Sequence, residues 1–276
     1  MAEEKEEDVI VLEPSSAWQL DYGEDKCRLV RKFGTAGNEH LLYFEQYAPG
    51  ASFTLVAAGP ALKAFQRNRL VSIEFAGNAN KIESRGWGEM ELFGPAIYKT
   101  DASLSPPPKQ EDRDADEEPG LPRIDVTQLS KGGGVTYAAK GRRIVFATGN
   151  LAAPLGALSD CGTQFVADWG LDLEQHRNAT RRTKFGSNMR SVVRSIIQSY
   201  PRKALDKGLS GTVKVLVFID QLGAVTDCRA LQVTQFVEVE QRLCEEMKRA
   251  IFVPALDRDG APMKSYYITD VLYEVN

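Results

Sequence analysis

The segment that most constrains the fold of this chain is Gly211 to Cys228, GTVKVLVFIDQLGAVTDC. Alternate positions of its first half hold β-branched residues, which are Val213, Val215, Val217 and Ile219. Strict alternation with period two is typical of a β-strand that turns one face to a core. A short polar turn with Gly223 follows, and the pattern of AVTDCRALQV predicts a second strand that runs back beside the first. The segment therefore predicts an antiparallel hairpin.

Helical patterns lie on both sides of this hairpin. NMRSVVRSIIQSYP is amphipathic and is ended by Pro201, and FVEVEQRLCEEMKRAIF is amphipathic and ends before Pro254. A last strand, SYYITDVLYEV, follows a turn at Asp259 and Gly260. The order of helix, strand, strand, helix and strand predicts a small α+β domain over residues 185–276, with helices on one sheet face.

The region before this domain is predicted to be rich in β-strands. CRLVRKFG, HLLYFEQYAPG, ASFTLVAAG and RLVSIEFAGN combine β-branched and aromatic residues and are separated by Gly, Pro and Asn. We therefore predict a β-rich N-terminal domain over residues 14–180, and apolar residues at helical spacing predict one helix in it at 151–168. The chain as a whole belongs to the α+β class.

Two polar segments are not expected to contribute to a core. Residues 1–13 form an acidic start that we expect to be disordered, and residues 101–122 combine prolines with an acidic run. The second segment is predicted to be mobile. A long surface loop within one domain and a linker between domains are equally good interpretations of it.

Charge argues against nucleic acid as the main partner, and hydropathy argues against a membrane-spanning segment. The net charge of -4 disfavours nucleic acid, because phosphate binding needs a basic surface. No run approaches the roughly 20 apolar residues of a membrane-spanning helix, so no membrane span is expected. The first residues carry no basic and apolar signal-peptide regions. They fit a cytosolic N-terminus or an exported chain whose signal peptide is absent equally well.

The sequence offers little catalytic chemistry. It has 2 histidines, His40 and His176, and both are expected in surface or turn positions. It shows no nucleophile elbow and no metal-binding helix motif. We therefore predict a protein that is not an enzyme, with no catalytic, cofactor-binding or metal-binding residues. The 4 cysteines lack C-x-x-C spacing, and two disulfides or four buried free thiols are both open.

Residues of the C-terminal domain carry a resemblance to a known family. They are Tyr200, Pro201, Ala204, Gly211, Val213, Asp220, Gly223, Val225, Phe252, Pro254, Ala255, Gly260 and Pro262. In combination, YPRKA, GTVKVLVFID, a helix and FVPALDRDGAP resemble the C-terminal domain of the TonB energy-transducer family, over roughly the last third of the chain. The opening WQLDYGEDKCRLVRKFG and the helix ending WGLD look like exported, sphingomonad-type TonB-related proteins without a membrane anchor.

The resemblance implies a periplasmic protein of a Gram-negative bacterium that binds a protein or peptide partner by adding it as a strand to a sheet edge. N-terminal segments of outer-membrane receptors are candidate partners, which links the protein to transport. The candidate edge residues are Tyr266, Tyr267, Ile268, Thr269, Val271 and Tyr273. The alternative is a structural or accessory module of the cell envelope in which this domain is a scaffold. The oligomeric state stays open.

An exported location also favours disulfides, because thiols are oxidised in the periplasm. The expected pairs are Cys228 with Cys244, joining the second hairpin strand to its covering helix, and Cys27 with Cys161, joining the N-terminal sheet to its helix. Simple alternation places Cys228 on the face opposite Val225. The first pair therefore requires a β-bulge.

Overall fold

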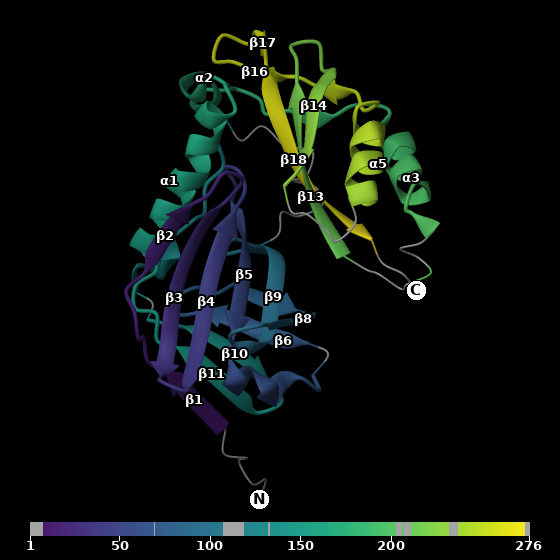
Figure 1. The fold of residues 1–276 in the computed structure, drawn as a ribbon. Helices are drawn as coiled ribbons and strands as arrows, with labels where there is room; N and C mark the ends of the chain where they lie inside the picture. Colours follow the sequence, from purple (N-terminus) through teal and green to yellow (C-terminus); the bar gives the residue numbers. More distant parts are fainter. Residues whose placement is uncertain are drawn as a thin grey trace, which may run out of the picture. The chain divides into compact units, whose positions relative to one another are not determined.

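A computed structural model describes residues 8–68, 70–106, 119–131, 133–202, 206, 211–231 and 237–273 (Figure 1). The chain divides into two compact units. The N-terminal unit comprises Met1–Pro108 and Pro122–Phe165, and the C-terminal unit comprises Lys109–Leu121 and Val166–Asn276. Both units contain strands and helices, and the fold is a β-rich member of the α+β class.

The N-terminal unit contains two sheets. The six-stranded sheet has the order β2-β3-β4-β5-β9-β8, and its strands are β2 (Gln19–Tyr22), β3 (Cys27–Thr35), β4 (Asn38–Gln46), β5 (Ser52–Ala58), β8 (Gly86–Met90) and β9 (Gly94–Ser103). The five-stranded sheet has the order β1-β11-β10-β6-β7, and its strands are β1 (Asp8–Leu12), β6 (Val71–Phe75), β7 (Lys81–Ser84), β10 (Val135–Ala139) and β11 (Arg142–Phe146).

Aromatic rings join these two sheets. Phe33 of β3 meets Phe146 of β11 edge to face with ring centroids 5.1 Å apart, and Phe44 of β4 lies 6.2 Å from Phe75 of β6. All of these rings are buried. The sheets therefore share one aromatic core, which accounts for the Phe-rich strand patterns of this half of the chain.

Among the described residues, the N-terminal part also holds the long helix α1 (Ala152–Asp168) and the 3-10 segments η1 (Pro60–Phe65) and η3 (Thr127–Lys131). A disulfide joins Cys161 of α1 to Cys27 of β3, with Cα atoms 6.1 Å apart. The helix approaches the sheet closely at Gly162, where a Cβ atom would lie 3.2 Å from the carbonyl oxygen of Ala48. Helix α1 is thus held against the six-stranded sheet by a disulfide, and Gly162 leaves room for the close approach.

The C-terminal unit is built on a three-stranded antiparallel sheet of order β14-β13-β18. Its elements are α2 (Leu173–Arg177), β12 (Lys184–Phe185), α3 (Met189–Gln198), β13 (Gly211–Ile219), β14 (Val225–Ala230), α5 (Val237–Met247), β15 (Phe252–Val253), β16 (Ala255–Leu256), β17 (Pro262–Met263) and β18 (Ser265–Tyr273). Helices α3 and α5 lie side by side on one face of the sheet (Figure 1). Their apolar sides share a core with the alternating valines of β13.

Several expectations from the sequence are confirmed. The hairpin, the two amphipathic helices, the final strand and the helix predicted at 151–168 all form, within a few residues of the expected bounds. The mixed α+β class is confirmed as well. Each of these predictions rested on a strong periodic pattern.

Other expectations are corrected. Residues 1–7 of the expected acidic tail lie outside the described residues, but Asp8–Leu12 is not disordered, because it pairs in parallel with β11. The predicted mobile loop at 101–122 lies largely outside the described residues, and its first residues belong to β9. The first unit ends at Phe165 instead of residue 180, because Trp169 packs on Phe218 and Tyr266 of the C-terminal sheet.

Candidate functional site

Strand β18 forms one edge of the C-terminal sheet. It pairs with β13 along its full length of 9 residues, from Ser265 opposite Ile219 to Tyr273 opposite Gly211. No second strand among the described residues pairs with its other side. The strand predicted from the sequence as the binding edge is therefore an edge in the structure.

The register shows which backbone groups of β18 point outward. The carbonyl oxygen of Lys214 accepts a hydrogen bond of 2.9 Å from the amide of Leu231, so the backbone groups of Lys214 point toward β14. Backbone directions alternate along an antiparallel strand, so the odd-numbered residues of β13 bond to β18. In β18, the residues whose N–H and C=O groups point away from β13 are therefore Tyr266, Ile268, Asp270 and Leu272.

The side chains of the predicted edge residues divide between the two sheet faces. Tyr267, Val271 and Tyr273 pack against the core beneath α3 and α5, and Thr269 lies on the same face, opposite Val215. Tyr266 and Ile268 lie on the other face, opposite Phe218 and Leu216. The sequence correctly placed all six residues on one strand. It did not identify Asp270 and Leu272, whose backbone groups also point away from β13, because these directions depend on the register between β13 and β18.

Aromatic residues hold the first part of β18. The ring of Tyr266 lies 4.9 Å from Trp169 and 5.9 Å from His176, between ring centroids. Burial raises the pKa of the Tyr266 hydroxyl. Next to it, the hydroxyls of Thr183 and Ser265 are hydrogen bonded. These contacts fix the start of the strand and leave the stretch from Ile268 onward as the more open part of the edge.

An ion pair crosses from β13 to this open part. Lys214 Nζ lies 2.7 Å from Asp270 Oδ1, and the two side chains are 14% and 25% exposed. Partial burial strengthens such a pair relative to a fully exposed one. Because the carboxylate of Asp270 binds Lys214 on β13, its side chain points across the sheet and not toward the open edge.

The opposite edge, β14, has a different construction. Ile219 pairs with Val225 and Phe218 pairs with Asp227, so Thr226 is an extra residue in a β-bulge. The bulge brings Cys228 onto the same face as Val225, and both pack against the helix-covered core. The bulge required by the sequence argument is confirmed. Bulges twist an edge and interrupt its ladder, which makes it a poor template for another strand.

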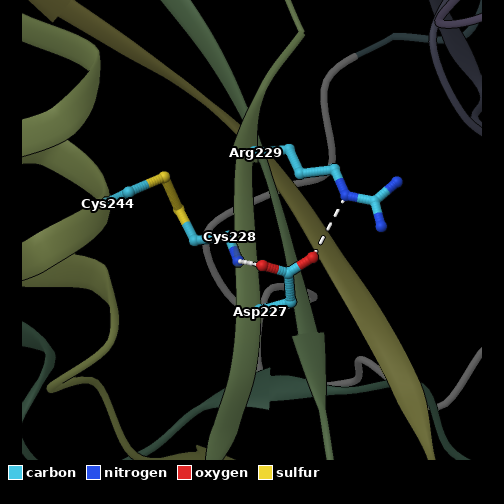
Figure 2. Close-up of a disulfide and its surroundings, with 4 residues drawn as sticks. All are labelled: Asp227, Cys228, Arg229 and Cys244. Carbon is cyan, nitrogen blue, oxygen red and sulfur yellow. Dashed lines mark hydrogen bonds and ion pairs between the residues drawn. A yellow bond between two sulfur atoms is a disulfide. The ribbon is translucent and has the colours of Figure 1, made fainter.

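The bulge is followed by a disulfide from Cys228 to Cys244 of α5, with Cα atoms 5.5 Å apart (Figure 2). Asp227 turns away from the disulfide, where its carboxylate accepts from the amide of Cys228 at 2.9 Å and from Arg229 Nε at 3.1 Å. Both disulfides expected from the sequence are thus present, and no cysteine among the described residues is free. Paired cysteines are typical of proteins from oxidising compartments.

Neither histidine occupies the surface or turn position expected from the sequence, since His40 lies in β4 and His176 in α2. His40 and His176 are buried. Nδ1 of His40 donates to the carbonyl of Asn38 at 3.1 Å and its Nε2 accepts from the amide of Ala61 at 3.0 Å, a pattern that only the neutral ring can make. Its ring also requires Gly59, whose Cβ would lie 2.1 Å from His40 Cδ2. His40 is therefore a structural residue of the N-terminal unit.

His176 differs from His40 in the hydrogen bonding of its Nε2 atom. Nδ1 donates to the carbonyl of Asp172 at 2.7 Å, whereas Nε2 is buried without a hydrogen-bond partner within the described part of the chain. Burial lowers the pKa of both rings. Each histidine is thus held neutral inside its own unit and is poorly placed to exchange protons with a substrate.

The buried carboxylate of Glu45 is also occupied by internal contacts. It lies 2.6 Å from Arg28 and 3.0 Å from Lys26, and it accepts from the Tyr47 hydroxyl at 3.1 Å. Burial and the nearby Glu45 charge raise the pKa of Tyr43 to about 12. Across the described residues, no group of three or more His, Cys, Asp or Glu is arranged to bind a metal ion.

Comparisons with known proteins add no family to this picture. No protein-family model matches the chain, and a search of curated proteins returns no match. Within the described ranges, no helix combines the length and apolar character needed to cross a membrane.

Proposed function

We propose that the C-terminal unit binds an extended segment of a protein partner by strand addition along β18. The observation that carries this proposal is the outward direction of the backbone groups of Ile268, Asp270 and Leu272 on an edge that no described strand covers. Such groups bond to an incoming strand as they would to a neighbour in the same sheet. Affinity then comes from the main chain, and no catalytic side chain is needed.

The location and the partner belong to the same proposal. Two disulfides support an exported protein of an oxidising compartment, and we assign it to the periplasm. The resemblance of the last third to TonB C-terminal domains supports a role beside outer-membrane receptors. Their periplasm-facing N-terminal segments are the partners to test first.

A proline at the edge tests this function. Ile268→Pro removes an outward N–H group, whereas Ile268→Ala keeps that group and removes most of the side chain. We expect Ile268→Pro to weaken binding of a labelled receptor-derived peptide by at least about tenfold, since unmatched hydrogen bonds cost about 1–3 kcal/mol. Ile268→Ala should have a smaller effect. Fluorescence anisotropy with the full chain measures both, and equal affinities for the two variants would contradict strand addition.

A further inference from the structure

A polar pocket in the N-terminal unit has no role in the proposed peptide binding. It has a volume of about 590 Å³, within the range of about 300–1,000 Å³ that is typical of small-molecule sites. It is lined by Gln66, Arg67, Asn68, Leu70, Arg85 and Trp87. These residues come from the segment between η1 and β6 and from the junction of β7 and β8, two segments separated in sequence.

Both walls of the pocket are held by backbone contacts. In the turn after η1, the amide of Gln66 donates to the carbonyl of Lys63 at 3.2 Å, and the amide of Asn68 donates to the carbonyl of Phe65 at 2.8 Å. The second wall is fixed at Gly86, where a Cβ atom would lie 2.4 Å from the Tyr98 carbonyl oxygen. Because Gly86 lies against β9, the flanking residues Arg85 and Trp87 are held at the pocket.

Hydrogen-bond donors dominate the lining, which is open to solvent at Gln66, Arg67, Leu70 and Arg85. Within the described part of the chain, neither Arg67 nor Arg85 forms an ion pair or a hydrogen bond. The indole Nε1 of Trp87 is buried and has no hydrogen-bond partner there either. The described lining residues include two guanidinium groups and no carboxylate, so their charge favours an anion.

The remaining lining residues narrow the class of ligand. Guanidinium groups bind carboxylate or phosphate through paired hydrogen bonds. The amides of Gln66 and Asn68 each offer donors and an acceptor, which matches hydroxyl groups. The face of an indole carries partial negative charge and packs against polarised C–H groups. We infer that this pocket binds an acidic sugar, a sugar ring that carries a carboxylate or a phosphate.

Indole N–H signals in NMR spectra of the full chain test this inference directly. The chain has 3 tryptophans, and Trp87→Phe identifies the Trp87 signal. Four probes separate the ring from the charge: glucuronate, glucose 6-phosphate, glucose and inorganic phosphate. We expect either acidic sugar to shift the Trp87 signal in a saturable way, and glucose or phosphate alone to shift it less than about a tenth as much at the same concentration.

Two arginine variants complete the test. Arg67→Gln and Arg85→Gln each remove one cation, and we expect each to raise the apparent Kd for the acidic sugars by at least about tenfold. Unchanged Trp18 and Trp169 signals show that a variant is folded. The inference is overturned if neither acidic sugar moves the Trp87 signal, if glucose or phosphate alone moves it equally, or if folded arginine variants bind as the unsubstituted chain does.

Discussion

The two units differ in the strands that form the edges of their sheets. In the N-terminal unit the edge strands are short, with 5 residues in β1, 4 in β2, 4 in β7 and 5 in β8. In the C-terminal unit β14 carries a bulge, whereas β18 is 9 residues long and pairs without a register shift. Short or bulged edges discourage the addition of further strands. Among the edges of the described sheets, β18 is therefore the best suited to accept one.

The disulfides give the largest expected difference between the units. The bond in the N-terminal unit spans a sequence separation of 134 residues and the bond in the C-terminal unit spans 16. In the chain-entropy model, loops of these lengths correspond to about 5 and about 3 kcal/mol of stability. We expect the Cys27→Ala, Cys161→Ala double variant to lose more stability than the Cys228→Ala, Cys244→Ala variant.

Denaturant unfolding measures the stability that each variant loses. Residue-resolved hydrogen exchange then shows which unit has lost it. The first double variant should raise exchange in β3 and β4, and the second should raise it in β14 and α5. If each variant destabilised both units to the same extent, the two units would have to unfold together, and the comparison between them would fail.

Neighbouring prolines in β18 give the next largest effect. Thr269 bonds to β13 and Ile268 points its N–H group outward. Thr269→Pro therefore leaves a buried backbone carbonyl without its donor and should cost about 3 kcal/mol, whereas Ile268→Pro should cost about 1 kcal/mol. Urea unfolding of both variants measures the difference. A larger loss for Ile268→Pro would show that the outward assignment is reversed.

The pH dependence is the smallest expected effect and compares the two buried histidines. Burial holds the pKa of His40 and of His176 below the usual 6.5. The unfolded chain therefore binds more protons than the folded chain as the pH falls below about 6.5, and stability decreases there by at most about 1.4 kcal/mol per pH unit for each ring. Above that pH the contribution of each ring is constant.

Single His40→Gln and His176→Gln variants isolate each contribution, because the chain has 2 histidines. Each variant should lose part of the acid sensitivity of its own unit, and NMR titration of the remaining ring gives its pKa. An imidazole pKa at or above 6.5 in the folded chain would contradict the burial argument for that residue.

The sequence predicted the C-terminal sheet well because its pattern is local. Val213, Val215 and Val217 alternate strictly, and the conflict between Val225 and Cys228 was enough to indicate the bulge that the structure contains. The last strand was a candidate edge because of the family resemblance, since the sequence does not show which strand of the sheet is free. Its outward backbone directions could not be predicted either, because they depend on the register between β13 and β18, which lie far apart in sequence.

Predictions from the sequence were wrong for side chains that are buried by residues far away in the chain. His40 lies in a strand that looks half polar, yet it is enclosed by Gly59, Ala61 and Phe146. The unit boundary was placed too late because Trp169 continues the helical apolar pattern, although its ring packs on another sheet. The pocket was missed for the same reason, since Arg67 and Trp87 are brought together by the fold.

The central claim is that β18 accepts a strand through its outward backbone groups. The most direct test is residue-resolved hydrogen exchange of the full chain with and without an extended receptor-derived peptide, using the same peptide with methylated backbone nitrogens as the control. We expect the unmodified peptide to slow exchange at Ile268, Asp270 and Leu272 and to leave β1, β2, β7 and β8 unchanged. Unchanged exchange at these β18 amides with the peptide bound, or equal protection by the methylated peptide, would contradict the claim.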